Sequence, residues 1–337
     1  MDLGVEQTPF DRFFVCSAGP APELATSSHQ LTIDGDAARP TTLTFDELAA
    51  MPQRDVTSWI ECAGNGRRLY EFVDGHVPTE TQTDTKWTLG AMAMATWSGP
   101  RLSEVIATAA PTDDLAWVAP TGLDIDNTEG EPVRICMPLT KALDPDTIVA
   151  LRMNGEPLPR AHGAPTRLMV PGWVGAYSVK WLGHLELSSK WVNSFRADTH
   201  YRLRDADGTD RGPATAHPVK SSVALPWDAV LTVDQDTDTA LTITGYARCG
   251  SSSIARVEYS IDDRAWQDAD LQPLASKWAW TPFSFEWRAE PGAHTIRTRA
   301  TTVDGSSQPE NVPYHPNTIL WNAITPHPVR VLARPTA

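Results

Sequence analysis

The chain has 337 residues, of which 41% are hydrophobic and 21% charged, and its formal net charge is −14. This is the composition of a globular protein long enough for two domains, which argues against an intrinsically disordered chain. The acidic balance argues against nucleic acid or an anionic membrane as a partner, because such surfaces attract basic proteins.

The N-terminal residues, MDLGVEQTPFDRFF, lack the basic and apolar regions of a signal peptide. No window approaches the roughly eighteen consecutive apolar residues of a membrane-spanning helix. We therefore expect a soluble protein, cytoplasmic in this form, or periplasmic or exported if a leader has been removed.

The first part of the chain mixes strands with short helices. Residues 30–35 (QLTIDG) and 55–62 (DVTSWIEC) have the β-branched and aromatic content of strands. Thr44 and Glu47 have the spacing of a capping box, which predicts a helix start, and residues 98–110 also predict a helix.

Between about 115 and 190, short strands predominate and are interrupted by proline and glycine. This pattern indicates an α+β domain rather than a regular βαβ alternation. No GxGxxG motif follows any of these strands, so a dinucleotide-binding fold has no support.

The composition changes over residues 204–218 (RDADGTDRGPATAHP), which predict a linker or long surface loop. Beyond it, segments of alternating apolar and polar residues recur at intervals of about ten residues, as in an antiparallel β-sandwich of immunoglobulin type. We expect two domains, residues 1–210 and 211–337.

Four cysteines are scattered without CxxC spacing. This excludes the usual patterns of a zinc ribbon, an iron–sulfur cluster and a covalent c-type haem, so no haem is expected. Cys62 stands out, because SWIECAGNGRR (58–68) carries it from a buried-looking strand into a glycine-rich turn that Arg67 and Arg68 follow. Its thiol is either a small buried hydrophobe, or a thiolate of lowered pKa that acts as metal ligand or nucleophile.

A second cluster lies in residues 156–183, EPLPRAHGAPTRLMVPGWVGAYSVKWLG. It places His162, Arg167 and Lys180 in an otherwise apolar segment. They are either surface cations on strand edges or the donors of an anion site, where backbone N–H groups of the glycine-rich stretches also contribute. A buried terminal phosphate suits this donor set better.

CAGNGRR, KWTLGAMAMATWSGPRL and PLPRAHGAPTRLMVPGWVGAYSVKWLG occur in this order and are followed by a tail that opens with HPVKSS. Together they resemble the sulfite oxidase family of molybdenum enzymes over nearly the whole chain. The resemblance implies an α+β molybdopterin-binding (sulfite oxidase-type) domain followed by an all-β immunoglobulin-like dimerisation domain. It further implies a molybdenum–molybdopterin cofactor, a small-molecule substrate, an external electron acceptor and a homodimer.

The same resemblance implies roles for individual residues. Cys62 matches the cysteine whose thiolate binds molybdenum beside the dithiolene of one pterin. His162, Arg167, Ser178 and Lys180 match residues that hold the pterin and its phosphate.

Four further positions match the surroundings of that cofactor. Asp124 aligns with an acidic position near it. Arg67 and Trp87 match an arginine and a tryptophan of the substrate pocket, and Tyr201 matches a tyrosine next to the metal.

Departures from the family pattern concern the substrate. The family's FVRSHFPVP-like segment reads FVCSAGPAP here, with Cys16 at the arginine and Ala18 at the histidine. Its WNLRG-like motif reads WNAIT in residues 321–325. We expect oxygen-atom transfer on sulfite or a related small sulfur compound. The alternatives are an S-oxide or N-oxide reductase and a metal-free binding protein that retains the fold.

Overall fold

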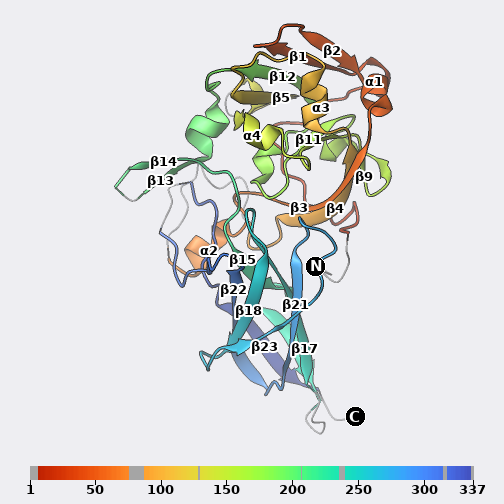
Figure 1. Cartoon of the computed structure of the whole chain (residues 1–337). Helices are drawn as coiled ribbons and strands as arrows, with labels where there is room; N and C mark the ends of the chain where they lie inside the picture. The colour runs from red at the N-terminus through yellow and green to blue at the C-terminus, as the bar shows by residue number, and fades with distance from the viewer. Residues whose placement is uncertain are drawn as a thin grey trace. The chain divides into compact units, whose positions relative to one another are not determined.

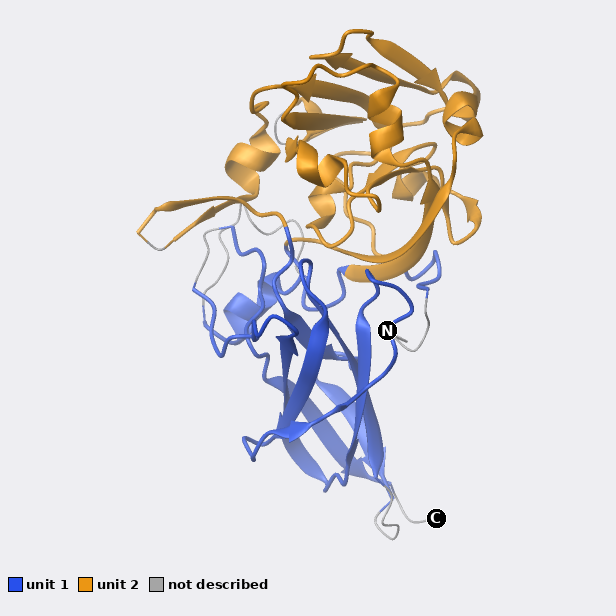
Figure 2. Ribbon diagram, in the orientation of Figure 1, with its two compact units in different colours: residues 1–12, 64–91, 216–337 blue, residues 13–63, 92–215 orange. Residues whose placement is uncertain are grey.

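The computed structural model of the chain describes residues 7–75, 87–127, 130–205, 207–234, 240–313 and 317–334. The chain divides into two compact units (Figure 2). Unit 2 contains Phe13–Ala63 and Met92–Thr215, and unit 1 contains Met1–Arg12, Gly64–Ala91 and Ala216–Ala337.

The largest sheet of unit 2 is mixed (Figure 1). Its described strands are β1 (Gln30–Gly35), β2 (Thr41–Thr44), β5 (Trp117–Ile125), β6 (Pro132–Arg134), β7 (Met137–Pro138) and β12 (Leu182–Ser188). They run in the order β2-β1-β12-β5-β6, with β7 also paired to β5, and β1 lies parallel to β12. The predicted strand over residues 30–35 is confirmed, and its alternate residues Leu31 and Ile33 are fully buried because a strand turns every second side chain to one face.

A second sheet of unit 2 leads to Cys62. It consists of β3 (Arg54–Glu61), β4 (Met92–Gly99), β9 (Arg152–Met153) and β10 (Glu156–Pro157), in the order β10-β9-β4-β3. The predicted strand over residues 55–62 is confirmed, and its last residue is Glu61. Trp59 and Ile60 are buried in it. A separate antiparallel pair, β8 (Ile148–Ala150) and β11 (Arg167–Met169), carries Arg167 opposite Ala150.

The described helices of unit 2 are short. They are α1 (Phe45–Ala50), α3 (Leu102–Ala107) and α4 (Leu139–Ala142), with the 3-10 turns η1 (Thr26–Ser28), η3 (Arg160–His162) and η4 (Gly175–Tyr177) and the π-helical η5 (Arg196–His200). The capping box at α1 is confirmed: Thr44 Oγ1 accepts from the Glu47 N–H at 3.2 Å, and the Glu47 carboxylate accepts from the Thr44 N–H at 2.8 Å. The helix predicted over residues 98–110 is confirmed in its central part.

Unit 1 contains two sheets that share one apolar core. The first runs β15-β17-β21-β20 and the second β16-β23-β22-β18-β19. Their strands are β15 (Lys220–Val223), β16 (Ala229–Val233), β17 (Leu241–Arg248), β18 (Ile254–Ile261), β19 (Gln267–Asp268), β20 (Asp270–Leu271), β21 (Thr281–Trp287), β22 (Gly292–Thr302) and β23 (His327–Ala333). Phe283 and Phe285 of one sheet belong to the same core cluster as Val257 and Ile296 of the other. β16 pairs with β23 in parallel, so the prediction of a purely antiparallel arrangement is wrong for that pair.

The predicted linker over residues 204–218 contains regular structure. β13 (Arg202–Arg204) and β14 (Asp210–Pro213) form an antiparallel pair (Figure 1). Arg202 Nε and Nη2 donate to the Asp210 carboxylate. These hydrogen bonds link the two strands through their side chains. The compact units separate between residues 215 and 216, and residues 64–91 group with the C-terminal part. The domain division at residues 210/211 stays a prediction.

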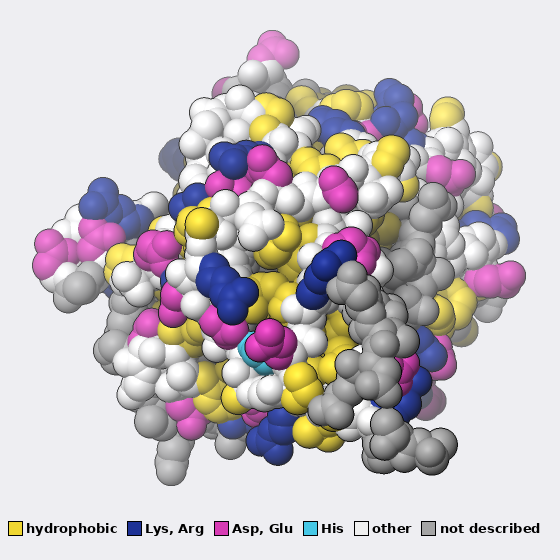
Figure 3. Space-filling view, turned by 90° about the horizontal axis from the view of Figure 1, so that it is seen from below, with side chains coloured by type: hydrophobic (Ala, Val, Ile, Leu, Met, Phe, Trp, Pro, Cys, Tyr) yellow, Lys and Arg dark blue, Asp and Glu magenta, His cyan; other side chains and the backbone are white. Residues whose placement is uncertain are grey.

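Among the described residues, no helix has the length and apolarity needed to cross a bilayer. On the face shown in Figure 3, basic and acidic side chains are interspersed. That face therefore presents no large field of one sign.

Candidate functional site

Cys62 lies directly after β3, where that strand leaves its sheet. The last pair of the β3–β4 ladder joins Glu61 to Met92. The turn η4 closes over the strand end, since a Cβ added to Gly175 would lie 2.9 Å from the Glu61 carbonyl oxygen. The Cys62 side chain is half-buried. Its position at the end of a buried strand is the predicted one.

Arg167 is a buried cation, with only 3% of its surface exposed. Its Nη1 donates to the His162 carbonyl oxygen at 3.0 Å and its Nη2 to the Ser178 carbonyl oxygen at 2.8 Å. The guanidinium carbon lies 4.8 Å from the centre of the Trp97 ring. Burial lowers the Arg167 pKa to about 9. Within the described part of the chain it forms no ion pair, and a buried charge is costly unless an opposite charge compensates it.

Lys180 adds a second cation beside Arg167. Its Nζ donates to the Ala161 carbonyl oxygen at 3.1 Å and to the Ser17 hydroxyl. Burial, followed by the positive charge of Arg167, lowers the Lys180 pKa to about 8, although Cys16 and Asp124 act in the opposite direction. Two neighbouring positive charges repel each other, and a bound anion would relieve that repulsion. The pair is therefore suited to bind an anion.

Asp124 is a buried carboxyl group near Lys180. Burial raises its pKa, while the charges of Lys180 and Arg196 oppose that rise. Its Oδ1 has no hydrogen-bond partner among the described residues. Since a buried acceptor left unpaired is costly, this oxygen is suited to receive an N–H donor from a ligand.

Gly163 allows the cationic side chains to approach one another. Its φ of +107° is left-handed, and an added Cβ would lie 3.0 Å from the Arg167 Cβ and 3.1 Å from the Lys180 Cβ. His162, immediately before it, packs its ring against Phe13 with centroids 5.0 Å apart. Ser178 fixes the facing loop, because its Oγ accepts from the Val170 N–H at 3.1 Å.

We expect Gly163→Ala to lower the free energy of unfolding by about 2–4 kcal/mol, the sum of left-handed strain and a backbone shift to relieve overpacking. Gly155→Ala is the matched control, because Gly155 has a φ of +81° and an added Cβ there meets nothing within 4 Å. Urea unfolding of both variants measures the difference. Equal losses in the two variants would contradict the close packing around Gly163.

Tyr201 follows η5 and lies in the electrostatic field of both Cys62 and Cys16. Burial raises the pKa of its hydroxyl, and negative charge on these two sulfurs raises it further, while Arg196 lowers it. The hydroxyl therefore stays protonated and can donate a hydrogen bond. The charge of Cys16, which the resemblance puts at an arginine position of the family, acts on the pKa of both Tyr201 and Lys180.

Arg196 was missed by the sequence reasoning. It pairs with the buried Asp126, and its positive charge lowers the pKa of Tyr201. The Tyr201 N–H donates to the Arg196 carbonyl oxygen at 2.8 Å, an i to i+5 bond of the π-helix that brings the two residues together. The only trace of this pairing in the sequence is the five-residue spacing between Arg196 and Tyr201. A search for α-helical or strand periodicity does not detect that spacing.

Arg67 and Trp87 belong to unit 1, whereas the other seven predicted site residues belong to unit 2. Arg67 is buried at the start of α2 (Arg67–Phe72), and its Nη2 would lie 3.0 Å from a Cβ added to Gly64. The neighbouring Arg68 N–H donates to the Trp87 carbonyl oxygen at 3.1 Å, so the segment of Trp87 is anchored to the first turn of that helix.

Comparison with known proteins defines a class. Residues 18–196 match the family model described as "Oxidoreductase molybdopterin binding domain". The chain is 31% identical to mitochondrial sulfite oxidase of Mus musculus, over 94% of this chain and 58% of that protein. It is 32% identical to sulfite oxidase of Gallus gallus, over 94% of this chain and 70% of that protein. The crystal structure of the sulfane dehydrogenase SoxCD from Paracoccus pantotrophus matches with a TM-score of 0.79 and 27% identity, over 93% of this chain and 80% of that chain.

The chain therefore belongs to the sulfite oxidase family of molybdopterin-dependent oxidoreductases. It spans 58% of the length of the mouse and human relatives. The family resemblance seen in the sequence is confirmed, and so is the molybdopterin-binding type of fold, which is rich in sheet and poor in helix.

The residues of unit 2 fit a molybdenum–pterin cofactor. No group of three His, Cys, Asp or Glu side chains in the described ranges is arranged to hold a metal ion. Cys62 offers one soft thiolate donor. The uncompensated charge of Arg167, with Lys180 beside it, suits a phosphate, and Asp124 Oδ1 suits a ring N–H.

Proposed function

We propose that the chain is a mononuclear molybdenum oxidoreductase that transfers an oxygen atom on sulfite or a related small sulfur compound. The observation that carries this proposal is the buried Arg167, which has no ion-pair partner among the described residues, with Lys180 beside it in the same unit as Cys62. Family membership supplies the reaction class.

Each residue has a proposed role in holding the cofactor. Cys62 binds the metal through its thiolate. Arg167 and Lys180 bind the terminal phosphate, and His162 and Ser178 shape the loop around the pterin. Asp124 accepts a hydrogen bond from the pterin ring. When bound, the cofactor supplies two-electron oxygen-atom transfer, and the protein supplies binding, orientation and electrostatics.

Four further residues have proposed roles toward the substrate. Tyr201 keeps its proton and donates a hydrogen bond to a substrate oxygen, and Arg196 holds the tyrosine in place. The resemblance also assigns Arg67 and Trp87 to the substrate pocket, where a guanidinium would attract negative charge that develops on the substrate. Electrons leave to an external acceptor.

We further propose that the sandwich of unit 1 is an immunoglobulin-like dimerisation domain. Its two sheets around one core support the assignment of fold. Exposed Val230 and Leu332 on the paired strands β16 and β23 are apolar side chains that a second copy would cover.

The substrate is proposed to carry less negative charge than sulfite. The resemblance puts Cys16 where the family has a guanidinium, and the effect of its charge on the pKa of both Lys180 and Tyr201 supports a position near the proposed site. A unit charge pair about 4 Å apart is worth roughly 4 kcal/mol at an effective dielectric near 20, before desolvation. The similar SoxCD structure is that of a sulfane dehydrogenase, which supports a sulfur compound other than sulfite as the substrate.

A substrate panel on molybdenum-loaded protein tests the proposal, with sulfite and the neutral thioether dimethyl sulfide assayed as reductants and methionine sulfoxide as oxidant. We expect oxidation of a sulfur compound and weak sulfite turnover. Cys16→Arg should then raise kcat/KM for sulfite at least about tenfold. That factor corresponds to only part of the energy of the charge pair. Cys249→Arg in unit 1 is the control and should change nothing.

Two results of this panel would contradict the proposal. Activity with methionine sulfoxide alone would make the chain a reductase. Metal-free protein purified from a host that makes the cofactor would make it a binding protein.

A further inference from the structure

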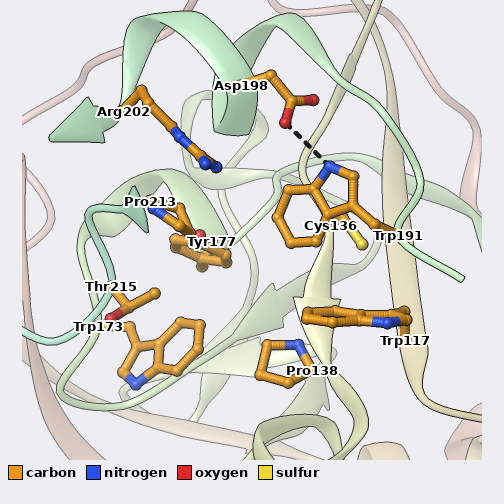
Figure 4. A pocket seen from close by; sticks show the side chains of 10 residues that line it. All are labelled: Trp117, Cys136, Pro138, Trp173, Tyr177, Trp191, Asp198, Arg202, Pro213 and Thr215. Atoms are coloured by element: carbon orange, nitrogen blue, oxygen red, sulfur yellow. Dashed lines mark hydrogen bonds between the residues drawn. The ribbon is translucent and has the colours of Figure 1, made fainter. Parts of the chain in front are cut away.

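A pocket of about 570 Å³ lies within unit 2 (Figure 4). We call it the tryptophan pocket, after Trp117, Trp173 and Trp191, which line it together with Tyr177, Asp198 and Arg202. None of the residues proposed to hold the cofactor or the substrate lines it. Its volume is that of a small-molecule site.

The walls of the tryptophan pocket are two pairs of aromatic rings. Trp117 and Trp191 meet at a centroid distance of 4.9 Å and an interplanar angle of 82°, and Trp173 and Tyr177 meet at 4.7 Å and 82°. In Figure 4 the two pairs lie on opposite sides of the pocket. Aromatic rings arranged in this way offer faces and edges to another planar ring.

Two hydrogen-bond donors of the tryptophan pocket remain available, the Tyr177 hydroxyl and Nη1 of Arg202. Asp198 is already occupied, since its carboxylate accepts from Trp191 Nε1 at 2.9 Å and from the Ser194 N–H at 2.7 Å. Burial raises the pKa of the Tyr177 hydroxyl, which keeps its proton and has no hydrogen-bond partner among the described residues. Arg202 donates to Asp210 through Nε and Nη2, which leaves Nη1 for a ligand. A ligand must therefore bring acceptors.

The charges around the tryptophan pocket favour a neutral ligand. A quaternary ammonium is disfavoured, because Arg202 lines the wall and the Lys141 ammonium already lies 5.8 Å from the centre of the Trp173 ring. An anion is disfavoured by Asp198. Burial raises the Cys136 pKa to about 11, so this thiol is neutral and contributes an apolar surface. A neutral planar ring with carbonyl oxygens meets all of these conditions.

We propose that the tryptophan pocket binds a quinone, which accepts the electrons that substrate oxidation releases. This inference rests on the proposed function. The pocket and the proposed site are linked through the chain, because Arg202 directly follows Tyr201 and Tyr177 directly precedes Ser178. In the balanced reaction, the substrate and water yield the oxygenated product, two protons and two electrons. The quinone takes up the two electrons and two protons and becomes the hydroquinone.

Titration of the holoenzyme with menadione, followed by tryptophan fluorescence, tests binding without turnover. We expect saturable quenching. Trp173→Leu should raise the Kd at least about tenfold through the loss of ring stacking. Tyr177→Phe should raise it about fivefold, since it removes one hydrogen bond. Tyr177→Phe deletes only an unpaired buried hydroxyl and should fold normally. Trp278→Leu in unit 1 is the matched control and should leave the Kd unchanged.

Turnover distinguishes this inference from the proposed function. Ferricyanide, a small one-electron acceptor, should support equal substrate oxidation in wild type and Tyr177→Phe, whereas menadione should show a raised KM in the variant. Absence of turnover with ferricyanide would count against the proposed function. The quenching titration would still show whether the tryptophan pocket binds menadione. Non-saturable quenching, an unchanged Kd in both pocket variants, or tighter binding of FMN than of menadione would overturn the quinone assignment.

Discussion

Cys62→Ser is expected to abolish turnover, with kcat at least about 1,000-fold lower, because a serine hydroxyl stays protonated at neutral pH and is a poor soft-metal ligand. The fold should persist. Cys62 follows β3 and is half-buried, outside the cores of both units. A cysteine-to-serine change at such a position should cost within about 1 kcal/mol of stability. Steady-state assays and thermal unfolding measure the two effects.

Cys249→Ser is the control for Cys62→Ser. Cys249 is also half-buried, and its sulfur lies 3.5 Å from the Ser251 hydroxyl in unit 1. It should retain full activity. Turnover above about a tenth of the wild-type rate in Cys62→Ser would contradict metal ligation by Cys62, since a direct ligand should cost far more than the 10–100-fold loss typical of outer-shell groups.

Arg167→Met and Lys180→Met are expected to weaken cofactor retention about 10–100-fold each, the range for hydrogen bonds to a charged group. The readout is the difference in Tm between cofactor-loaded and cofactor-free protein, which reports ligand affinity by mass action. In wild type the difference should be large, and in both variants it should shrink by the equivalent of about 1.4–2.7 kcal/mol.

The two variants should differ in their cofactor-free forms. Arg167→Met leaves the buried carbonyl oxygens of His162 and Ser178 without their donor, so it should destabilise the protein itself. Lys180→Met removes a charge that disfavours the charge of Arg167, so it should cost less. Lys190→Met, at an exposed position, is the matched control. An undiminished Tm difference in both site variants would contradict the phosphate-binding role.

Features set by local sequence were predictable. The capping box of Thr44 and Glu47, the strand that leads to Cys62, and the alternating strands of unit 1 all follow from side chains a few residues apart. The grouping of His162, Arg167 and Lys180 was also predictable, because a short glycine- and proline-rich segment leaves these side chains near one another.

Features that depend on distant contacts were not predictable from one sequence. The parallel pairing of β16 with β23 joins segments about a hundred residues apart, and nothing in the alternation of either strand specifies it. The influence of Cys16 on Lys180 and Tyr201 likewise depends on the packing of the N-terminal segment. Arg196 was not found from the sequence because a five-residue spacing belongs to the π-helix, which is rare in proteins. Where π-helical turns do occur, they are often at functional sites.

X-ray absorption at the molybdenum edge of wild-type and Cys62→Ser protein tests the central claim most directly. We expect about one molybdenum per wild-type chain, with a sulfur coordination number that falls by one in Cys62→Ser, since the variant retains only the sulfurs of the cofactor. An unchanged sulfur count in the variant, or wild-type protein that holds no molybdenum when produced with the cofactor, would contradict metal ligation by Cys62.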